Sequence, residues 1–439
     1  MGGSRAWVPD DGGGNTPGGA ESLWVACEDA HDACPAAIPP PKRRRMRMLI
    51  ISQYYLPQPL ANAEVIGGLA EGLSDLGHKV QLVTPVGGAP EHAGVTVRRQ
   101  IGFYSRNRRS PLMRVLEYGT FTVGAAHGGM RGPRPDVIIV PSPPPTLGMV
   151  GALVSALRRV PLIYVVQDLY PEVAVATGAV RPGTLLRMLR AAMRIVYRRS
   201  AAVVAIDESI VPAIQQVSPG ARVEVIRNGI DLRPFAGAAR DDDWLRGIGA
   251  DPQKVVVMYA GNVGRSQDLV AVAEATRGAG TELVIHGGGA ELAQLRSVGA
   301  VRGWDHVHFS EYVDREKLGR VYASGDLHVV PLKPDIASAS VPSKLLSIFA
   351  AGRPAIVVAE SNTAAARLIT ESGGGWSIPP GSPAAIGRAI REACDRPEEL
   401  AARGDRALTW ALANAGSERA AAEYVGVMTT VVGHGPRRG

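Results

Sequence analysis

The sequence alternates short apolar runs with longer amphipathic stretches from Met48 onward. The first apolar run, MLIIS, is followed by a helical pattern over Val65–Leu76 and then by a second run, HKVQLVTP. Four further strand-like runs follow, and each precedes a loop or a helix: DVIIV, PLIYVV, AVVAI and RVEVI. Strands that alternate with helices in this way are typical of parallel sheets built from βαβ units.

The pattern stops at Pro234–Asp243 and then restarts. The stretch FAGAARDDD reads as a linker, and five more apolar runs follow it: KVVVMYAG, ELVIHGGG, HVHFSEYV, LHVVPL and PAIVVA. We therefore expect an α/β protein with two doubly wound, Rossmann-like domains over 46–235 and 236–412, and a C-terminal helix and tail over 413–439. Ligands bind beyond the carboxyl ends of the strands in such sheets, so two facing domains would leave a cleft between them.

Residues 1–45 form a leader that we expect to be disordered. The segment is rich in Gly, Pro, Ala and acidic residues, and it lacks the charged start and apolar centre of a signal peptide. The longest uncharged stretch, Val137–Leu157, has the length of a membrane span, but the sequence PSPPP in its middle would stop a helix. We predict a buried strand, a turn and a helix there, and no transmembrane segment.

The amino-acid composition excludes some classes of function and favours others. With 46% apolar and 20% charged residues, a folded core is expected. The net charge of +7 is compatible with nucleic acid, an anionic membrane or phosphorylated substrates, and the low aromatic content of 5% argues against a nucleic-acid groove. The three cysteines, of which only Cys394 lies in the body of the chain, show no zinc spacing and favour a reducing cytosol.

Two glycine-rich loops directly follow predicted strands of the second half. Gly261-Asn262-Val263-Gly264-Arg265-Ser266 follows VVVMYA, and Gly287–Gly289 follows ELVIH. Glycines let a backbone approach a phosphate closely, the next helix offers free N–H groups, and Arg265 adds a planar donor set. An ordinary strand-to-helix turn is the alternative. Neither loop reads GxGxxG, which counts against a nicotinamide dehydrogenase.

A third candidate lies at Val341–Ala359. Pro342-Ser343-Lys344 would open a helix, so Lys344 and the helix N-terminus could together hold a diphosphate. The alternative is a solvated lysine on an ordinary helix.

Seven stretches, taken together, resemble retaining GT-B glycosyltransferases of family 4, in particular the bacterial PSK-motif branch that builds surface polysaccharides. They are LIISQYYLPQP, GLAEGLSDLGHKVQLVTP, VVQDLYPEVAVATG, VIRNGIDLRPF, VVVMYAGNVGRSQDL, LVIHGGGAEL and VPSKLLSIFAAGRPAI. The resemblance implies a cytoplasmic transferase that uses a nucleotide-sugar donor, by default UDP-linked, with no cofactor and no metal. The acceptor would be a hydroxyl of a lipid-linked glycan or a small molecule.

The resemblance also implies roles for individual residues. Asp168 and Glu172, in QDLYPE, would face the cleft as catalytic candidates, and Arg265 and Lys344 would hold the donor diphosphate. These two cations would stabilise the negative charge that develops on the leaving group in a front-face displacement. The family places a mobile loop and helix start near the transferred sugar at Gly67 and Gly68. The remaining donor-binding positions are Asn262, Gly264, Gly287, Gly288, Ser343 and Ser347.

The sequence departs from the family at three positions. Ala339 and Ser347 replace the usual Glu-x7-Glu pair, whose second member contacts the ribose, and Gln167 replaces the usual His before Asp168. Two alternatives stay open: a sugar-nucleotide epimerase of GT-B fold, and a non-catalytic sugar-nucleotide-binding protein. The acidic run over 241–243 lies in the expected linker and reads as a solvated loop rather than a metal site.

One feature is independent of the family. Arg187, Arg190, Arg194 and Arg198 form a basic stripe on a predicted helix over 185–199. Such a helix can dock on anionic lipid, which would place the protein peripherally on the inner face of the membrane. The alternative is a helix that packs on its own sheet with a solvated arginine face. A second basic cluster consists of Arg106, Arg108, Arg109 and Arg114.

Overall fold

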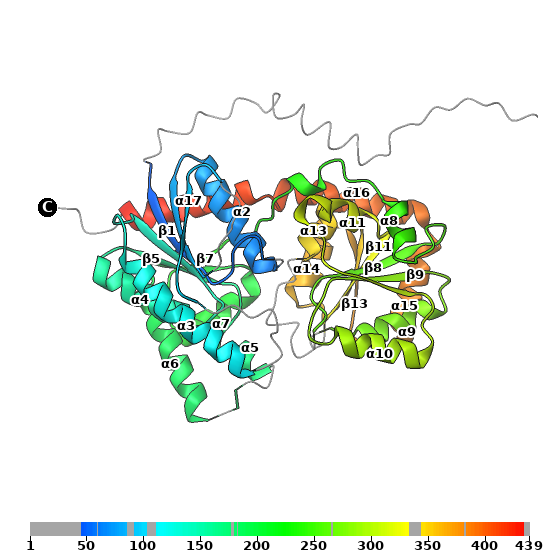
Figure 1. The fold of residues 1–439 in the computed structure, drawn as a ribbon, viewed down its shortest axis with the longest axis horizontal. Coiled ribbons are helices and arrows are strands. Elements are labelled where there is room, and N and C mark those ends of the chain that lie inside the picture. Colours follow the sequence, from blue (N-terminus) through cyan, green and yellow to red (C-terminus); the bar gives the residue numbers. More distant parts are fainter. Residues whose placement is uncertain are drawn as a thin grey trace, which may run out of the picture. The chain divides into compact units, whose positions relative to one another are not determined.

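The computed structural model describes most of the chain after the leader. The described residues are 45–58, 60–85, 92–102, 111–176, 180–181, 183–264, 267–332, 344–381 and 383–433. The predicted disordered leader up to residue 44 lies outside them, as do Arg106, Arg108, Arg109 and the side chain of Arg114. Figure 1 shows the two parallel sheets, each with helices packed on it.

The first sheet has seven parallel strands in the order β3-β2-β1-β4-β5-β6-β7. Its inner strands are buried apolar runs because helices cover both faces of the sheet. The strands are β1 (Arg47–Ile51), β2 (Lys79–Thr84), β3 (Val95–Arg99), β4 (Val137–Pro141), β5 (Leu162–Val166), β6 (Ala202–Ala205) and β7 (Val223–Val225). The helices are α2 (Ala61–Asp75), α3 (Pro111–Met130), α4 (Thr146–Arg158), α5 (Glu172–Ala176), α6 (Thr184–Arg199), η1 (Glu208–Ile210), α7 (Val211–Val217) and η2 (Arg233–Phe235).

The second sheet has six parallel strands in the order β10-β9-β8-β11-β12-β13. The strands are β8 (Val256–Ala260), β9 (Glu282–His286), β10 (Val307–Ser310), β11 (Leu327–Pro331), β12 (Ala355–Val358) and β13 (Gly375–Ile378). The helices are α8 (Asp242–Gly247), α9 (Leu269–Arg277), α10 (Leu292–Arg302), η3 (Arg315–Lys317), α11 (Leu318–Ala323), α13 (Lys344–Ala350), α14 (Ala364–Ser372), α15 (Pro383–Cys394) and α16 (Pro397–Asn414). The sequence pattern predicted both sheets as parallel and doubly wound, and the structure confirms this.

The segment predicted to be a linker is partly helical. Asp241 caps α8 by accepting a hydrogen bond from the Trp244 N–H at 2.9 Å, and it pairs with Arg320 at 3.0 Å. The expectation of a solvated loop at 241–243 is therefore wrong, because these carboxylates begin a helix, where they interact favourably with its positive end. Within the described ranges, no group of three or more His, Cys, Asp or Glu residues is arranged to hold a metal ion.

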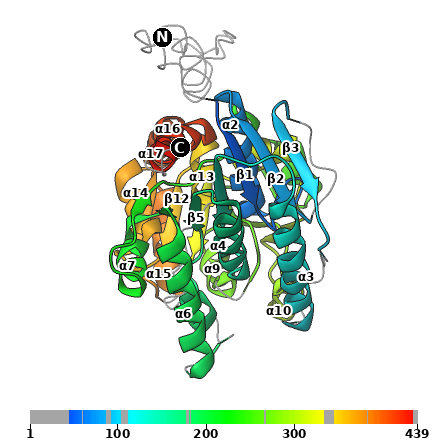
Figure 2. The same ribbon diagram turned by 90° about the vertical axis from the view of Figure 1, so that its left-hand side faces the viewer.

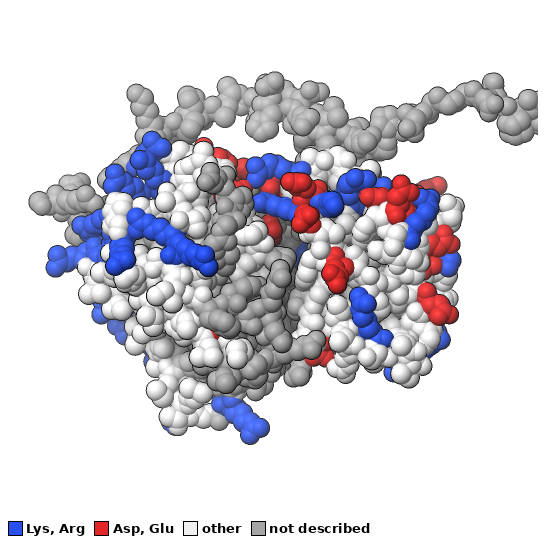
Figure 3. Space-filling model, viewed as in Figure 1, with Lys and Arg blue, Asp and Glu red and all other residues white. Residues whose placement is uncertain are grey.

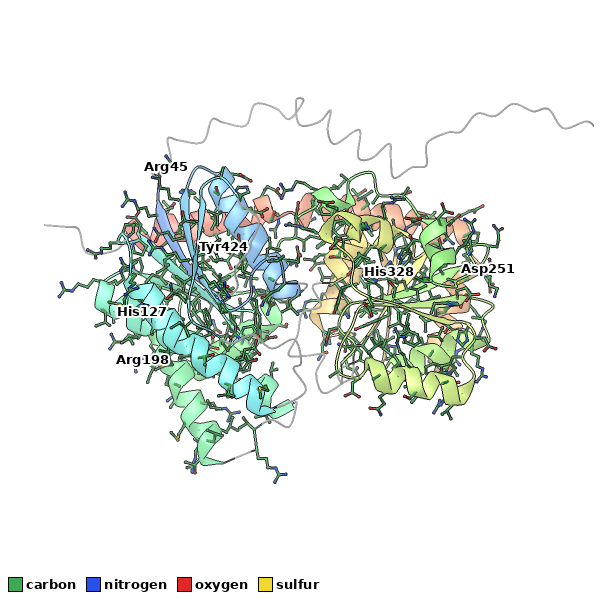
Figure 4. All side chains as sticks on the ribbon, viewed as in Figure 1. Arg45, His127, Arg198, Asp251, His328 and Tyr424 are labelled. Atoms are coloured by element: carbon green, nitrogen blue, oxygen red, sulfur yellow. The ribbon has the colours of Figure 1, made fainter. Side chains whose placement is uncertain are left out.

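The last helix, α17 (Ser417–Gly433), returns to the first domain. Its buried face, which includes Tyr424 and Met428, belongs to the same apolar cluster as the strands of the first sheet (Figure 4). The chain thus crosses between the domains twice, and the two crossings are joined. Ile230 N–H donates to the Ala415 carbonyl at 2.8 Å, and Ser417 N–H donates to the Ile230 carbonyl at 2.9 Å.

The stretch that has the length of a membrane span, 137–157, forms β4, a proline-containing turn and most of α4, as predicted. In the part of the chain that the structure describes, no helix combines the length and the apolar character needed to cross a bilayer.

Candidate functional site

Two glycine loops run side by side at the carboxyl edge of the second sheet. Gly261 N–H donates to the His286 carbonyl at 2.9 Å, and Val263 N–H donates to the Gly288 carbonyl at 2.8 Å. Gly287 has φ +129°, and a Cβ there would lie 2.2 Å from the Gly261 carbonyl oxygen. Only glycine fits this close backbone approach. The structure therefore brings the two predicted loops into one backbone-lined surface.

Lys344 reaches this surface from the start of α13. Its Nζ donates to Tyr259 Oη at 2.9 Å and lies 4.2 Å from the centre of that ring. A Cβ on Gly261 would lie 3.3 Å from Nζ, so the ammonium sits beside the first glycine loop. Burial lowers the pKa of Lys344 to about 7. Burial is the only cause of this shift, and among the described residues no carboxylate pairs with the ammonium.

Some of the remaining predicted positions on this side lie among the described residues, and others do not. Asn262 and Gly264 lie in the first loop, where Asn262 is exposed and Gly264 N–H donates to Gln267 Oε1 at 3.1 Å. Ser347 lies on α13, one turn after Lys344, and is partly buried. Arg265, Ser343 and Ala339 lie outside the described residues, so their placement stays a prediction.

Two aromatic side chains beside the glycine loops were not anticipated from the sequence. His286 ends β9 and is buried; its Nδ1 lies 3.2 Å from Ser310 Oγ, and its Nε2 has no partner among the described residues. Burial lowers the pKa of His286 to about 4, so the ring is neutral. Tyr312 is partly exposed and lies against Gly288, 3.3 Å from where a Cβ would be. His286 stands in the stretch LVIHGGGAEL and Tyr312 lies outside the seven stretches, and nothing in the sequence marked either side chain for a role at the loops.

The carboxyl edge of the first sheet is organised around Ser142, which follows β4. Its Oγ accepts hydrogen bonds from the backbone N–H groups of Gln167 and Asp168, both at 3.1 Å, and donates to the Asp168 carbonyl. The Gln167 amide forms a reciprocal pair with Asn228, with N–O distances of 3.0 and 2.8 Å. Gln167, which replaces the family histidine, is therefore held by Asn228 in this structure.

Asp168 and Glu172 lie one turn apart after β5 but have different surroundings. Asp168 is half-buried, and burial raises the pKa of its carboxyl to about 6. Glu172 begins α5, and its Oε1 lies 3.4 Å from Nε of Arg190 on α6. Its other oxygen, Oε2, is buried and has no hydrogen-bond partner among the described residues, so the catalytic role expected for Glu172 stays a prediction.

Gly67 and Gly68 do not lie at a helix start. Both are inside α2, which begins at Ala61. A Cβ on Gly67 would lie 2.6 Å from Leu56 Cδ1, and one on Gly68 would lie 3.0 Å from Ser417 Cβ. The expected mobile loop at these positions is wrong, because the glycines allow α2 to pack closely against the loop that precedes it and against α17.

Two glutamines in the loop between β1 and α2 were missed by the sequence analysis. Gln53 is fully buried, and neither polar atom of its side chain has a hydrogen-bond partner among the described residues. Gln58 accepts a hydrogen bond from the Tyr55 N–H at 3.2 Å, while its Nε2 also lacks a partner within the described ranges. Because β1 neighbours β4, this loop emerges at the same edge as Ser142. A buried polar group without a partner costs about 1–3 kcal/mol, so both amides are candidates for ligand contacts.

Both halves of the chain are similar to known families. The model of a glycosyl transferase 4-like domain matches residues 63–229, and the model named glycosyl transferases group 1 matches residues 254–396. A protein of Escherichia coli K12 named for a glycosyl transferase of colanic acid biosynthesis, WcaI, is 27% identical over 376 residues, 79% of this chain and 92% of the relative. A protein of Pseudomonas aeruginosa named as a glycosyltransferase, WbjE, is 26% identical over 65% of this chain and 72% of the relative.

Solved structures show the same fold at lower identity. Sucrose-phosphate synthase from Thermosynechococcus elongatus has a TM-score of 0.71 at 16% identity, covering 89% of this chain and 100% of that protein. Anabaena HepE in complex with UDP and glucose has a TM-score of 0.67 at 15% identity, covering 88% and 100%. WaaG, a glycosyltransferase involved in lipopolysaccharide biosynthesis, has a TM-score of 0.65 at 14% identity, covering 87% and 99%.

Proposed function

The chain belongs to the glycosyltransferases of the GT-B fold, and on this premise we propose that it transfers a sugar from a nucleotide diphosphate to a hydroxyl acceptor with retention of configuration. We place it in the family 4 branch with the PSK motif. The observation that carries the proposal is the ammonium of Lys344, which lies beside two backbone-lined glycine loops and has no carboxylate partner among the described residues.

The donor diphosphate would supply the charge that Lys344 lacks. The glycine loops leave room for phosphate oxygens to approach the backbone, and Arg265, which follows the first loop in sequence, would add a second cation. We propose UDP as the nucleotide, because UDP is the nucleotide in the HepE complex, which shares this fold. With two cations on the diphosphate, the proposed reaction needs neither a metal ion nor a cofactor.

The proposed chemistry is a front-face displacement. As the bond between the sugar and the diphosphate breaks, negative charge grows on the leaving oxygen, and this oxygen accepts the proton of the incoming hydroxyl. Lys344 and Arg265 would bind the diphosphate more tightly as that charge grows, which is the condition for lowering the barrier. Asp168, which is ionised above about pH 6, would stabilise the oxocarbenium-like sugar.

The acceptor would bind at the edge of the first sheet. Gln53 and Gln58 offer amide groups that can both donate and accept hydrogen bonds, which suits the hydroxyl groups of a sugar. We propose a glycan acceptor, either lipid-linked or free.

Calorimetric titration tests the donor site. Lys344→Ala and Arg265→Ala should each weaken UDP binding about ten- to hundredfold, because a charge-assisted contact to phosphate contributes roughly 1.5–3 kcal/mol. Uridine, which has no phosphate, should bind all variants alike. Lys317→Ala, an exposed lysine on η3, is the control and should bind UDP as the wild type does. If all variants bound UDP equally, the donor site would lie elsewhere.

Product analysis then separates this function from the two alternatives. Mass spectrometry should detect a glycosylated acceptor and free UDP in equal amounts. Interconversion of UDP-sugars without an acceptor would identify an epimerase, and binding of UDP-sugar without release of UDP would identify a non-catalytic binding protein.

A further inference from the structure

Three neighbouring helices, α3, α4 and α6, cover one face of the first sheet (Figures 1 and 2). In the described part of the chain, nine of the 14 exposed large apolar side chains lie on these three helices. The most exposed on each are Val123 on α3 at 72%, Leu157 on α4 at 60% and Met188 on α6 at 64%. Exposed apolar side chains gathered on one face, rather than scattered singly, indicate a contact surface.

The charge on this surface has one sign. Helices α4 and α6 contain no carboxylate, and the one acidic residue of α3, Glu117, is buried. Helix α6 carries five arginines, and Arg158 and Arg159 end α4. In Figure 3 the first domain presents mostly cationic and uncharged groups, whereas cations and carboxylates are mixed on the second domain.

Helix α6 shows why a solvated arginine face is not a sufficient explanation. Leu186, Met193 and Val196 are buried against the domain, yet Leu185 and Met188 are 57% and 64% exposed between the arginines. Solvation accounts for the arginines but not for these apolar side chains.

Three of the four arginines in the predicted stripe also have local partners, and that of Arg187 is the neutral Thr184 hydroxyl one turn earlier, 3.3 Å from its guanidinium. Arg190 pairs with Glu172, and Arg194 donates to the Val217 carbonyl at 2.9 Å. Arg187 and Arg198 are exposed, and Arg198 lies near the end of α6 that enters β6 (Figure 4). These two are therefore the residues to substitute.

We propose that the outer surface of α3, α4 and α6 docks the protein on an anionic lipid bilayer. The absence of carboxylates on the described outer faces of these helices suits anionic headgroups, and the apolar side chains between the arginines suit the acyl region just beneath them. Each of the three helices connects parallel strands of the first sheet, so each begins at the carboxyl edge of the sheet, which carries Asp168. A hydroxyl acceptor held in the bilayer would therefore be presented on the acceptor side of the protein. This inference adds a partner to the proposed function, and vesicle binding tests it independently of any transfer activity.

Vesicle flotation of the full chain is the first test. The protein should float with vesicles that contain phosphatidylglycerol and stay behind with pure phosphatidylcholine. Arg187→Glu with Arg198→Glu should lower the affinity at least about tenfold, since each cation near an anionic surface contributes about a fivefold factor. Arg388→Glu with Arg391→Glu, two exposed arginines on α15 of the second domain, is the matched control and should leave binding unchanged.

The apolar contribution is tested separately. Leu185→Ser with Met188→Ser should weaken binding several-fold and remove the part that survives at high salt, where the arginines are screened. Val301→Ser, which removes an apolar side chain that is 88% exposed on α10, should have no effect. An unchanged melting temperature shows that each variant is folded, and if a pair unfolds, Arg198→Glu alone replaces it.

Three outcomes would overturn the proposal. They are a wild-type protein that does not float with anionic vesicles, equal binding to both kinds of vesicle, and equal binding of wild type and both surface variants. A dimer that these substitutions dissociate, without vesicle binding, would make the surface a contact between copies of this chain and would equally refute a lipid partner.

Discussion

At the carboxyl edge of the second sheet, two glycine loops are joined by backbone hydrogen bonds beside the ammonium of Lys344. At the same edge of the first sheet, the polar groups are side chains: the Ser142 hydroxyl, the Asp168 carboxyl and the amides of Gln53 and Gln167. The backbone surface and the ammonium of the second edge suit the anionic donor that we propose there. The neutral donors and acceptors of the first edge suit the hydroxyl groups of the proposed acceptor.

Burial also acts on the two edges in opposite directions. It lowers the pKa of Lys344 to about 7 and raises the pKa of Asp168 to about 6. Both shifts bring the neutral form within reach of physiological pH, because burial disfavours the charged form of each group. A diphosphate beside Lys344 would raise its pKa again, and a cationic sugar centre beside Asp168 would lower the pKa of that carboxyl.

The largest expected effect comes from disturbing the contact between the two glycine loops. Gly287→Ala places a Cβ 2.2 Å from the Gly261 carbonyl oxygen at a φ of +129°, so one loop must move. We expect UDP affinity to fall more than about hundredfold, with a lower melting temperature. Gly278→Ala, where φ is −99° and nothing lies within 4 Å of a new Cβ, is the control. Calorimetry and thermal unfolding check both, and normal UDP binding by Gly287→Ala would contradict a backbone-built donor site.

On the first edge, Asp168→Asn should lower kcat about hundredfold while leaving the affinity for UDP unchanged. In the wild type, kcat should fall as pH drops through about 6, because the carboxylate is then protonated. The asparagine variant should lack this acidic limb. If kcat of Asp168→Asn still falls as the pH drops through about 6, a group other than Asp168 causes the pH dependence.

Donor binding should have the opposite pH dependence, because Lys344 binds the diphosphate in its protonated form. Free Lys344 loses its proton above about pH 7, and the diphosphate binds the protonated form, so affinity should fall by up to about tenfold per pH unit above that value. A UDP-sugar is the suitable ligand, since its diphosphate has no titration near neutral pH. Calorimetry in buffers of different ionisation enthalpy should detect proton uptake. Lys344→Arg, which stays charged, should abolish both effects.

The smallest effect is expected at the acceptor amides. Gln53→Leu removes two buried polar atoms that have no partner among the described residues, so the free energy of unfolding should stay equal or rise by about 1 kcal/mol. The KM for the acceptor should rise several-fold while the KM for the donor is unchanged. Gln215→Leu, at an exposed position on α7, is the control. Denaturant unfolding measures the stability, and steady-state kinetics measure the two KM values. If Gln53→Leu lowers the stability and leaves the acceptor KM unchanged, the role of Gln53 is structural.

The sequence predicted the inner strands of both sheets because they are continuous apolar runs that are buried on two faces. It missed β3 and β13, which are edge strands whose residues are mostly only partly buried. Their short, mixed sequences contain no run that distinguishes them from loops. The packing of α17 on the first domain was equally unpredictable, since an amphipathic helix does not specify its partner.

The two candidate edges were not equally predictable either. Glycine is the residue that a close backbone approach requires, and the glycine-rich loops that marked the proposed donor side include Gly287, where such an approach occurs. Serine and glutamine are common in any chain, and the roles of Ser142 and Gln53 depend on contacts with distant segments. The position of Gly67 and Gly68 inside α2 was not predicted either, because helix packing selects small residues as strongly as a ligand does.

The return of α17 to the first domain has a consequence for synthesis. Its buried residues, from Ala420 to Val431, complete the apolar cluster that the strands near the start of the chain begin. As the chain leaves the ribosome, the first domain must therefore wait, with part of its core uncovered, until the whole second domain has been made. A stop codon just before α17 would remove part of the first domain's core rather than a dispensable tail.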